Sequence, residues 1–415
     1  MRVHVWTEAD GTALATSLRR EKLEFEVTSS ATAQRCPREP RWLEMPEHVN
    51  DVGIFRSFVI EPPSRATWDA LSRVLRQDTS RHRTGELNTA LWYPARPRRD
   101  LQSVVYSGPA VQPRYPIYII SKGRWESRKT VKALERMRVR YRIVVEPQEV
   151  EQYAAVLPRE NILPLPARLS NLGQGGIPAR NFVWDHAMRS GAKRHWILDD
   201  NIEHFFRRNH NAKRRVLSGA IFRAAEDFVD RWANVPLAGL QYDFFVPDAG
   251  TSCLAPFVLN RRIYSCILID HHQIEHLRWR GKYNEDTDLS LRVLKEGYCT
   301  ILFHAFLQKK VATMRMKGGN TDSLYKNGRK DFVKSLVKQH GDVARHVVRY
   351  GRDHHHVDYS AFRNNPLVPR KGGRSYTARM NEYGMRLVSV PKESRSPRSS
   401  RSPRSRRSSH SRRNS

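Results

Sequence analysis

Two adjacent carboxylates stand where an expected strand of this sequence ends. Asp199 and Asp200 directly follow the apolar run HWIL at residues 195–198. Ligands of open α/β sheets bind at the carboxyl ends of strands. A pair of carboxylates there can hold a hard divalent cation between the two phosphates of a nucleotide diphosphate. Aspartates also begin turns and cap helices, so the pair alone is equally compatible with a structural role.

A second acidic group opens a segment with helical periodicity. Glu285, Asp286 and Asp288 lie at the start of an amphipathic run, where backbone N–H groups and the helix dipole favour carboxylates. Asp286 or Thr287 can simply be the helix cap. A carboxylate that faces a cleft can instead remove the proton from an attacking hydroxyl. Asp286 is our first candidate for such a base and Glu285 the second, because the sequence does not show which one points into the cleft.

Two basic segments precede the acidic pair and are suited to bind phosphate or ribose. The first, SKGRW, follows an apolar run and offers Ser121 and Arg124. The second, GQGGIPARN, has glycines that let a ligand approach the backbone, followed by Arg180 and Asn181 at a helix start. Each has a plainer explanation, a surface arginine or an ordinary loop. Their order along the chain, together with the acidic groups, favours one binding site for a nucleotide diphosphate.

One histidine could join the acidic pair. His304 lies in the run LFHAF, at the expected end of a strand. An imidazole there can complete the ligand shell of a metal ion. The alternative is a buried histidine of the core.

The elements that must position these residues alternate between strands and helices. This alternation at short spacing predicts an α/β fold with a Rossmann-like, mostly parallel, doubly wound sheet and helices on both faces. The expected strands are residues 115–121, 141–147, 195–200, 237–245, 253–260 and 265–270, and the expected helices are residues 127–137, 179–191, 218–233 and 287–297.

The flanking parts of the chain differ from this domain in composition. We expect an N-terminal α/β accessory region, a proline-rich linker, the α/β domain, an irregular extension and a disordered tail. The extension holds His354, His355 and His356, which we leave outside the site because they lack partners at metal-ligand spacing. The expected boundaries are 1–93, 94–114, 115–345, 346–390 and 391–415.

The chain carries a large positive charge. Its 73 Lys and Arg residues against 42 Asp and Glu residues give a formal charge of +31. The Arg/Ser-rich tail, residues 391–415, accounts for +8 of it, with nine basic residues and one acidic one, so +23 remains on the other residues. A polyanion such as DNA is the expected partner. A merely basic surface and an inert solubilising tail are the alternatives.

Cysteine spacing and hydropathy suggest a compartment. The four cysteines lie far apart, without the close pairs of zinc sites or disulfide scaffolds, which fits a reducing cytoplasm. The first residues lack the apolar core of a signal peptide, and no apolar run reaches the roughly 18 residues that span a bilayer. We therefore expect a cytoplasmic protein without a membrane partner.

Several motifs together resemble one known family. YPIYIISKGR, YRIVVEP, GIPARNFVWDHA, HWILDDN, YNEDTDLSLRVL and the later MKGGN are similar to a GT-A glycosyltransferase, specifically to the TET-associated glycosyltransferase family of phages that hypermodify their DNA. The similarity extends from residue 115 to about residue 334. The pairing of ARNFVWDHA with HWILDDN is its most specific part.

The resemblance implies transfer of a sugar from a nucleotide-sugar, such as UDP-glucose, to 5-hydroxymethylcytosine or 5-hydroxymethyluracil in DNA. A TET/JBP-type dioxygenase would supply the hydroxymethyl group, and the cytoplasm would be that of a phage host. Manganese or magnesium would be the cofactor. By this resemblance Asp199 and Asp200 match the metal and ribose contacts, Asp286 the base of inverting relatives, and His304 with Lys317, Gly318, Gly319 and Asn320 would close over the diphosphate. The Asp-Asp-Asn order departs from a spaced D-x-D, which leaves the roles of Asp199, Asp200 and Asn201 open.

A DNA acceptor would need contacts of its own. Trp279 and Tyr283, just before the acidic helix start, can stack on an extruded base, although core packing is the other interpretation. Two other functions remain open. Paired carboxylates and a basic groove also suit a metal-dependent nucleotidyltransferase or nuclease, and caps with a basic tail suit a non-enzymatic nucleic-acid-binding protein.

Overall fold

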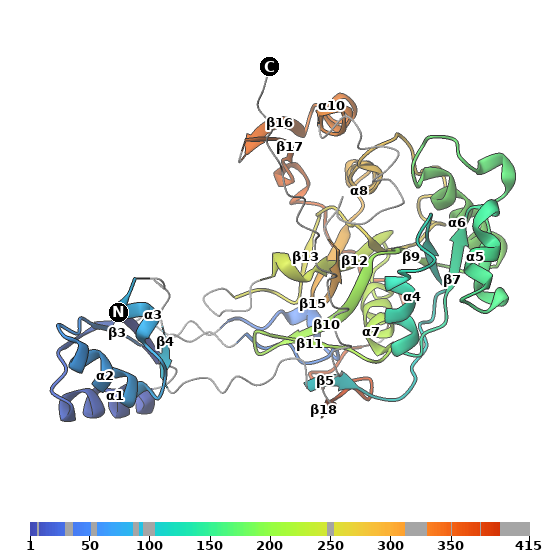
Figure 1. Ribbon diagram of the computed structural model, residues 1–415. Coiled ribbons are helices and arrows are strands. Elements are labelled where there is room, and N and C mark those ends of the chain that lie inside the picture. The colour runs from blue at the N-terminus through green and yellow to red at the C-terminus, as the bar shows by residue number, and fades with distance from the viewer. Residues whose placement is uncertain are drawn as a thin grey trace, which may run out of the picture.

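A large mixed sheet forms the centre of the molecule (Figure 1). The computed structural model describes residues 1–5, 8–29, 36–50, 56–85, 91–93, 104–246, 253–311, 330–349, 351–373 and 375–390. The ten-stranded sheet has the order β11-β10-β15-β12-β14-β9-β6-β7-β8, and β13 pairs with β15. Its strands are β6 (Ile117–Ile120), β7 (Arg142–Val145), β8 (Ile162–Pro164), β9 (His195–Asp199), β10 (Ile202–Asn209), β11 (Ala212–Arg215), β12 (Leu237–Tyr242), β13 (Phe257–Leu259), β14 (Cys266–Ile269) and β15 (Thr300–Lys310).

Most strands of this sheet run in one direction. β8, β7, β6 and β9 are parallel neighbours, and β12 is parallel to β15. β14 lies between β12 and β9 and is antiparallel to both. No helix of four or more residues separates β12 from β14 in the described part of that connection, and a parallel return needs a long crossover. The expectation of a mostly parallel sheet is confirmed, with β14, β10 and β13 as antiparallel strands.

Helices cover both faces of the sheet. α4 (Lys129–Arg136), α5 (Val150–Ala154) and α7 (Ala220–Val229) contribute to one hydrophobic cluster, and α6 (Ile177–Arg189) and α8 (Glu285–Lys295) to the other. Alternate residues of β9 enter the two clusters, with Trp196 and Leu198 in the first and Ile197 in the second. A strand buried on both faces is apolar throughout. The expected doubly wound arrangement is therefore confirmed.

A small α/β unit precedes the central sheet. Its own four-stranded sheet has the order β2-β3-β1-β4, and its own hydrophobic cluster includes Val3, Leu14, Phe58 and Leu71. In Figure 1 it stands beside the main body, in blue. Ser64 begins α2 with a capping box. The elements are β1 (Arg2–Val5), α1 (Glu8–Arg20), β2 (Phe25–Ser29), β3 (Arg56–Ile60), α2 (Arg65–Leu75), α3 (Ser80–Arg83) and β4 (Leu91–Tyr93).

The segment 36–50, between β2 and β3, packs on the central body instead. The Trp42 ring lies 5.0 Å from that of Phe228 and 5.8 Å from that of Phe306. A disulfide joins Cys36 to Cys253, which the cysteine spacing does not indicate, because 217 residues separate them and only the fold brings their Cα atoms to 5.3 Å. This pairing corrects the expectation of unpaired cysteines. The cytoplasmic location stays a prediction.

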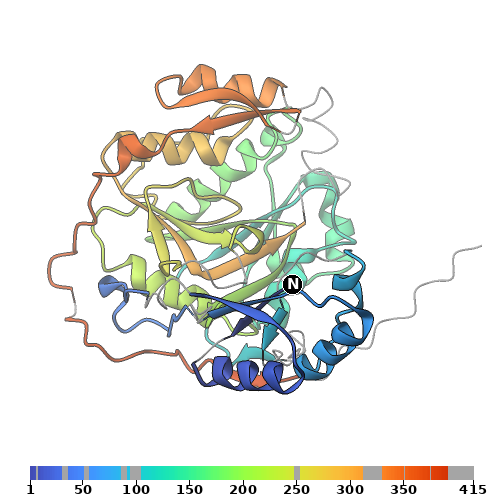
Figure 2. The ribbon, with the colours of Figure 1, turned by 90° about the vertical axis from the view of Figure 1, so that its left-hand side faces the viewer.

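The chain after β15 adds a second small unit. α10 (Lys330–Gln339), β16 (Ala344–Arg349) and β17 (Arg352–Val357) lie beside α8 (Figure 2) and share a hydrophobic cluster with it. The hairpin corrects the expectation that residues after 345 are irregular. Its polar strand DHHHV lacks the apolar alternation by which strands are recognised. Further on, β18 (Arg386–Ser389) pairs with β5 (Val104–Ser107), and the described residues contain no helix that could cross a membrane.

Candidate functional site

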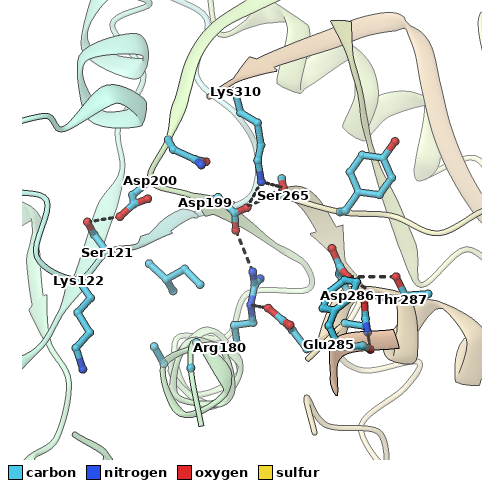
Figure 3. Close-up of a pocket in the computed structure, with 18 of the residues that line it drawn as sticks. Ser121, Lys122, Arg180, Asp199, Asp200, Ser265, Glu285, Asp286, Thr287 and Lys310 are labelled. Carbon is cyan, nitrogen blue, oxygen red and sulfur yellow. Dashed lines mark hydrogen bonds and ion pairs between the residues drawn. The ribbon is translucent and has the colours of Figure 1, made fainter. Parts of the chain in front are cut away.

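A pocket of about 570 Å³ opens where five parallel strands end. The last residues of β6, β7, β9, β12 and β15 line it, and the start of α8 forms its opposite wall. Figure 3 shows Ser121 and Asp200 on one side and Asp286 on the other, with Asp199, Arg180 and Lys310 between them. The pocket thus brings together seven residues that the sequence singles out, which are Ser121, Arg124, Arg180, Asp199, Asp200, Glu285 and Asp286.

Asp199 lies between two cations. Its Oδ1 is 3.0 Å from Arg180 Nη2, and its Oδ2 is 3.0 Å from Lys310 Nζ. The Ser265 hydroxyl also donates to Oδ2, at 2.7 Å. Burial alone would raise the pKa of Asp199, but Lys310 and Arg180 outweigh it and hold this pKa well below the ordinary value. Asp199 is therefore a carboxylate at every physiological pH.

Asp200 has a matching set of partners on the other side of β9. Arg124 forms an ion pair with its Oδ1, and the Ser121 hydroxyl donates to its Oδ2 at 2.8 Å. The Tyr153 hydroxyl lies 2.6 Å from Ser121 Oγ. Burial raises the pKa of Asp200 in spite of Arg124. The expected residues Ser121 and Arg124 do reach the acidic pair, but they contact its carboxylates rather than open space.

Arg180 is buried and incompletely satisfied. Its side chain is only 6% exposed, and its Nε lies 3.5 Å from Glu285 Oε1. The guanidinium packs over the Trp279 ring at 4.8 Å. The buried Nη1 has no hydrogen-bond partner among the described residues. An unsatisfied cationic donor on the wall of a pocket is suited to an anionic ligand.

The start of α8 supplies two carboxylates with different surroundings. Glu285 is held by Arg180, and burial, together with the neighbouring Asp286, raises its pKa. Asp286 Oδ1 accepts a hydrogen bond from the Thr287 backbone at 2.7 Å and has no ion pair among the described residues. Asp286 is thus the carboxylate that remains available to a ligand.

Four expected site residues lie elsewhere. Asn181 exchanges hydrogen bonds of 3.0 Å with the backbone of Trp279, whose ring is in the core. Tyr283 is half-buried near Phe332 and does not line the pocket. His304 is partly buried in β15, burial lowers its pKa to about 4, and it does not line the pocket either.

The expected loop Lys317, Gly318, Gly319 and Asn320 lies outside the described residues.

The pocket also contains residues that sequence reasoning missed. Lys310 ends β15, and Arg262 lines the pocket with its guanidinium 5.1 Å from the Tyr264 ring. In the described part of the chain Arg262 has no ion pair. From the hairpin come Asp353, His354 and His355, where burial lowers the pKa of His355 to about 4. The histidine run was the available signal, but its polar strand was not recognised.

The described residues do not fit the expected divalent-cation site. Asp199 and Asp200 both have their carboxylate oxygens engaged by Lys310, Arg180, Arg124 and two serines. His304 does not reach them. Within the described ranges no group of three or more His, Cys, Asp or Glu side chains is placed to hold a metal ion.

Comparison with known proteins identifies one family. Residues 115–319 match the family model described as TET-Associated Glycosyltransferase. This stretch runs from β6 to just beyond β15 and holds the acidic pair and the start of α8. No curated protein matches the chain. The resemblance expected from the sequence motifs is thereby confirmed.

Proposed function

Because residues 115–319 belong to the TET-Associated Glycosyltransferase family, we propose that this glycosyltransferase transfers a sugar from a nucleotide-sugar to a hydroxymethylated pyrimidine in DNA. One observation carries the proposal. One pocket sets the cation-lined strand ends opposite Asp286, a carboxylate that has no ion pair among the described residues. A nucleotide diphosphate would lie at the strand ends and the acceptor hydroxyl at Asp286.

Sheet order supports this place for the donor. The chain passes from β6 outward to β7 and β8 and then returns to β9 on the other side of β6. The strand order therefore reverses between β6 and β9, and ligands of doubly wound sheets bind at such a switch point. Ser121 and Asp199 lie there. We assign the domain to the GT-A type on this basis, with UDP-glucose as one example of a donor.

The surroundings of the two acidic residues of α8 suggest their roles. Asp286 would accept the proton of the acceptor hydroxyl as its oxygen bonds to the anomeric carbon and the bond from that carbon to the diphosphate breaks. Direct displacement of this kind inverts the anomeric centre. Glu285 would hold Arg180 rather than act as the base, because the two already form an ion pair. We therefore propose Asp286 as the base and Glu285 as the residue that positions Arg180.

Exposed aromatic rings supply a surface for the acceptor base. Phe244 and Phe245, in the short helix η5 (Asp243–Phe245) after β12, are 62% and 52% exposed, and Phe245 lines the pocket. Phe244 stacks on Tyr242 with ring centroids 5.2 Å apart. Bases that leave a duplex stack on such rings. We assign to these two the acceptor role first expected of Trp279 and Tyr283.

The positive charge supports a nucleic-acid acceptor. A formal charge of +31 exceeds what one nucleotide-sugar requires and suits a phosphate backbone. The substrate hydroxyl would come from a dioxygenase of the TET/JBP type that oxidises a pyrimidine methyl group. DNA and that dioxygenase are accordingly the proposed partners, the second through its product.

The test is a direct assay of the product. Purified protein is incubated with DNA that contains 5-hydroxymethylcytosine or 5-hydroxymethyluracil and with a panel of nucleotide-sugars, with manganese, magnesium or EDTA. Nucleosides are then analysed by mass spectrometry, with unmodified DNA and the Asp286→Asn protein as controls. The expected result is a hexose- or pentose-sized adduct on one modified nucleoside only. No adduct with any donor on either DNA would contradict the proposal, and DNA cleavage would indicate a nuclease instead.

A further inference from the structure

Among the described residues, cations and serine hydroxyl groups contact every carboxylate oxygen of the acidic pair. Resting on the proposed function, we propose that this enzyme binds the diphosphate of its donor with buried cationic side chains, Lys310 foremost, and uses no divalent cation there. The family expectation of manganese or magnesium makes the opposite prediction. The contacts of Asp199 and Asp200 are the observation that separates the two.

The central sheet fixes the position of Lys310. It is the last residue of β15, next to β12, and its side chain is 12% exposed. Its Nζ donates to Asp199 Oδ2 at 3.0 Å and to Ser265 Oγ at 2.9 Å, and lies 5.3 Å from the centroid of the Tyr242 ring. Figure 3 shows the ammonium group directed into the pocket. Burial would lower the pKa of Lys310, but Asp199 outweighs it and raises this pKa above its ordinary value.

All four carboxylate oxygens of the acidic pair are already engaged. On Asp199, Oδ1 meets Arg180 and Oδ2 meets Lys310 and Ser265. On Asp200, Oδ1 meets Arg124 and Oδ2 meets Ser121. A hard cation needs such oxygens as its ligands, and here it would have to displace ammonium and guanidinium groups.

Three cations contact the acidic pair, and one of them is shared with Glu285. Arg124, Arg180 and Lys310 bring three positive charges, against the two negative charges of the acidic pair and that of Glu285, which pairs with Arg180. The site is partly buried, where charges interact several times more strongly than in bulk water. A divalent cation would have to displace these ammonium and guanidinium groups from the carboxylates, whereas a diphosphate could bind to the same groups.

Two arginines can still donate to the phosphate oxygens. Arg180 Nη1 has no partner among the described residues, and Arg262 has no ion pair among them. When the anomeric carbon passes to the acceptor oxygen, the bonding electrons of the broken bond remain on the diphosphate, which gains negative charge. Preorganised cations stabilise that charge without reorganisation. Lys310, Arg180 and Arg262 would thus perform the electrostatic part of the work usually given to a metal ion.

The experiment measures binding rather than turnover. Pyrophosphate and the four common nucleoside diphosphates are titrated into the full-length protein by calorimetry, once with EDTA and once with manganese, and manganese binding is followed separately by electron paramagnetic resonance. We expect the same diphosphate affinity in both buffers and no stoichiometric manganese signal. Pyrophosphate removes any contribution from ribose or base.

Two variants and one control sharpen the test. Lys310→Met should weaken pyrophosphate binding about tenfold to hundredfold, as expected for loss of one charge-assisted hydrogen bond. Lys309→Met is the matched control, because Lys309 is 46% exposed and its ammonium pairs loosely with Glu203 at 3.9 Å. Asp199→Asn should leave pyrophosphate binding unchanged or stronger, because it releases Lys310. If Asp199 were a metal ligand, Asp199→Asn would instead weaken pyrophosphate binding. The affinity of the Asp199→Asn protein can be measured whether or not Lys310→Met folds.

The outcomes separate the inference from the proposed function. Diphosphate binding that requires manganese, or that is lost in Asp199→Asn, overturns the inference and leaves the glycosyltransferase proposal standing. Equal affinities of the Lys310→Met and Lys309→Met proteins also overturn it. If neither pyrophosphate nor any nucleoside diphosphate binds in either buffer, the proposed function fails and the inference fails with it.

Discussion

Asp199 and Asp288 have similar immediate surroundings but lie in different places. Asp288, in the first turn of α8, is 1% exposed and binds Arg280, Arg292 and His340. His340 directly follows α10, so this cluster links α10 to α8. Asp199 has as many cationic and hydroxyl partners, yet its partners line a pocket. The same set of cationic partners therefore has a structural role at Asp288, which does not line the pocket, and can belong to a ligand site at Asp199, which does.

The first test of this difference lies within one helix. Asp286→Asn should lower kcat by about a hundredfold to ten-thousandfold, the usual loss when a general base is removed. Its stability should change little, because Asp286 has no ion pair among the described residues. Steady-state assays with the donor found by mass spectrometry measure the first effect and thermal unfolding the second. Full activity of this protein would remove Asp286 from the role of base.

The matching change two residues on should have the opposite effects. Asp288→Asn leaves Arg292 and His340 without their charged partner, and breaking a buried ion pair costs about 3 kcal/mol, the lower end of the usual range because Arg280 is half exposed. Urea denaturation would measure this loss. Diphosphate binding should persist at temperatures where the protein remains folded. A stable but inactive Asp288→Asn protein would mean that the two clusters are not distinct in function.

Sequence reasoning reached the strand ends because their signal is local. β9 is an apolar run that ends in Asp199, and such a strand predicts both a buried sheet and a polar edge. Lys310 and Arg262 carry no comparable signal. Their positions depend on β15 lying beside β12 and on β14 pairing with β9, which are contacts between distant parts of the chain.

The same limit explains the histidines. His304 looks like a metal ligand because it lies near an expected strand end, but β15 continues to Lys310 and places it in mid-strand. The segment with His354 and His355 was expected to be irregular because its strand is polar. That strand nevertheless forms a hairpin, and both histidines line the pocket. A residue's distance from a strand end cannot be judged until the strand's true length is known.

A second comparison sets exposed against buried aromatics. Replacing Phe244 and Phe245 by alanine should weaken binding of DNA with an extrudable modified base about tenfold to hundredfold, because one stacked base is worth roughly 1–3 kcal/mol. Fluorescence anisotropy with labelled DNA measures the affinity. Diphosphate binding serves as the internal control and should not change. Trp279→Phe, a change in the core, should not alter DNA affinity in the folded protein.

The smallest expected effect on activity concerns His304. Burial lowers the pKa of His304 to about 4, so the folded protein keeps this side chain neutral where the unfolded chain, with an ordinary value of 6.5, binds a proton. Its contribution to stability is therefore present above pH 6.5 and is lost as pH falls from 6.5 towards 4. His304→Gln should flatten the fall of unfolding free energy over that interval and keep kcat within about twofold at pH 7.5, because the side chain does not line the pocket. Denaturation at several pH values, with activity measured in EDTA and in manganese, checks both statements. If His304→Gln lost an activity that depends on manganese, His304 would have a role in the binding site, as Asp199 does, and not only a structural role, as Asp288 does.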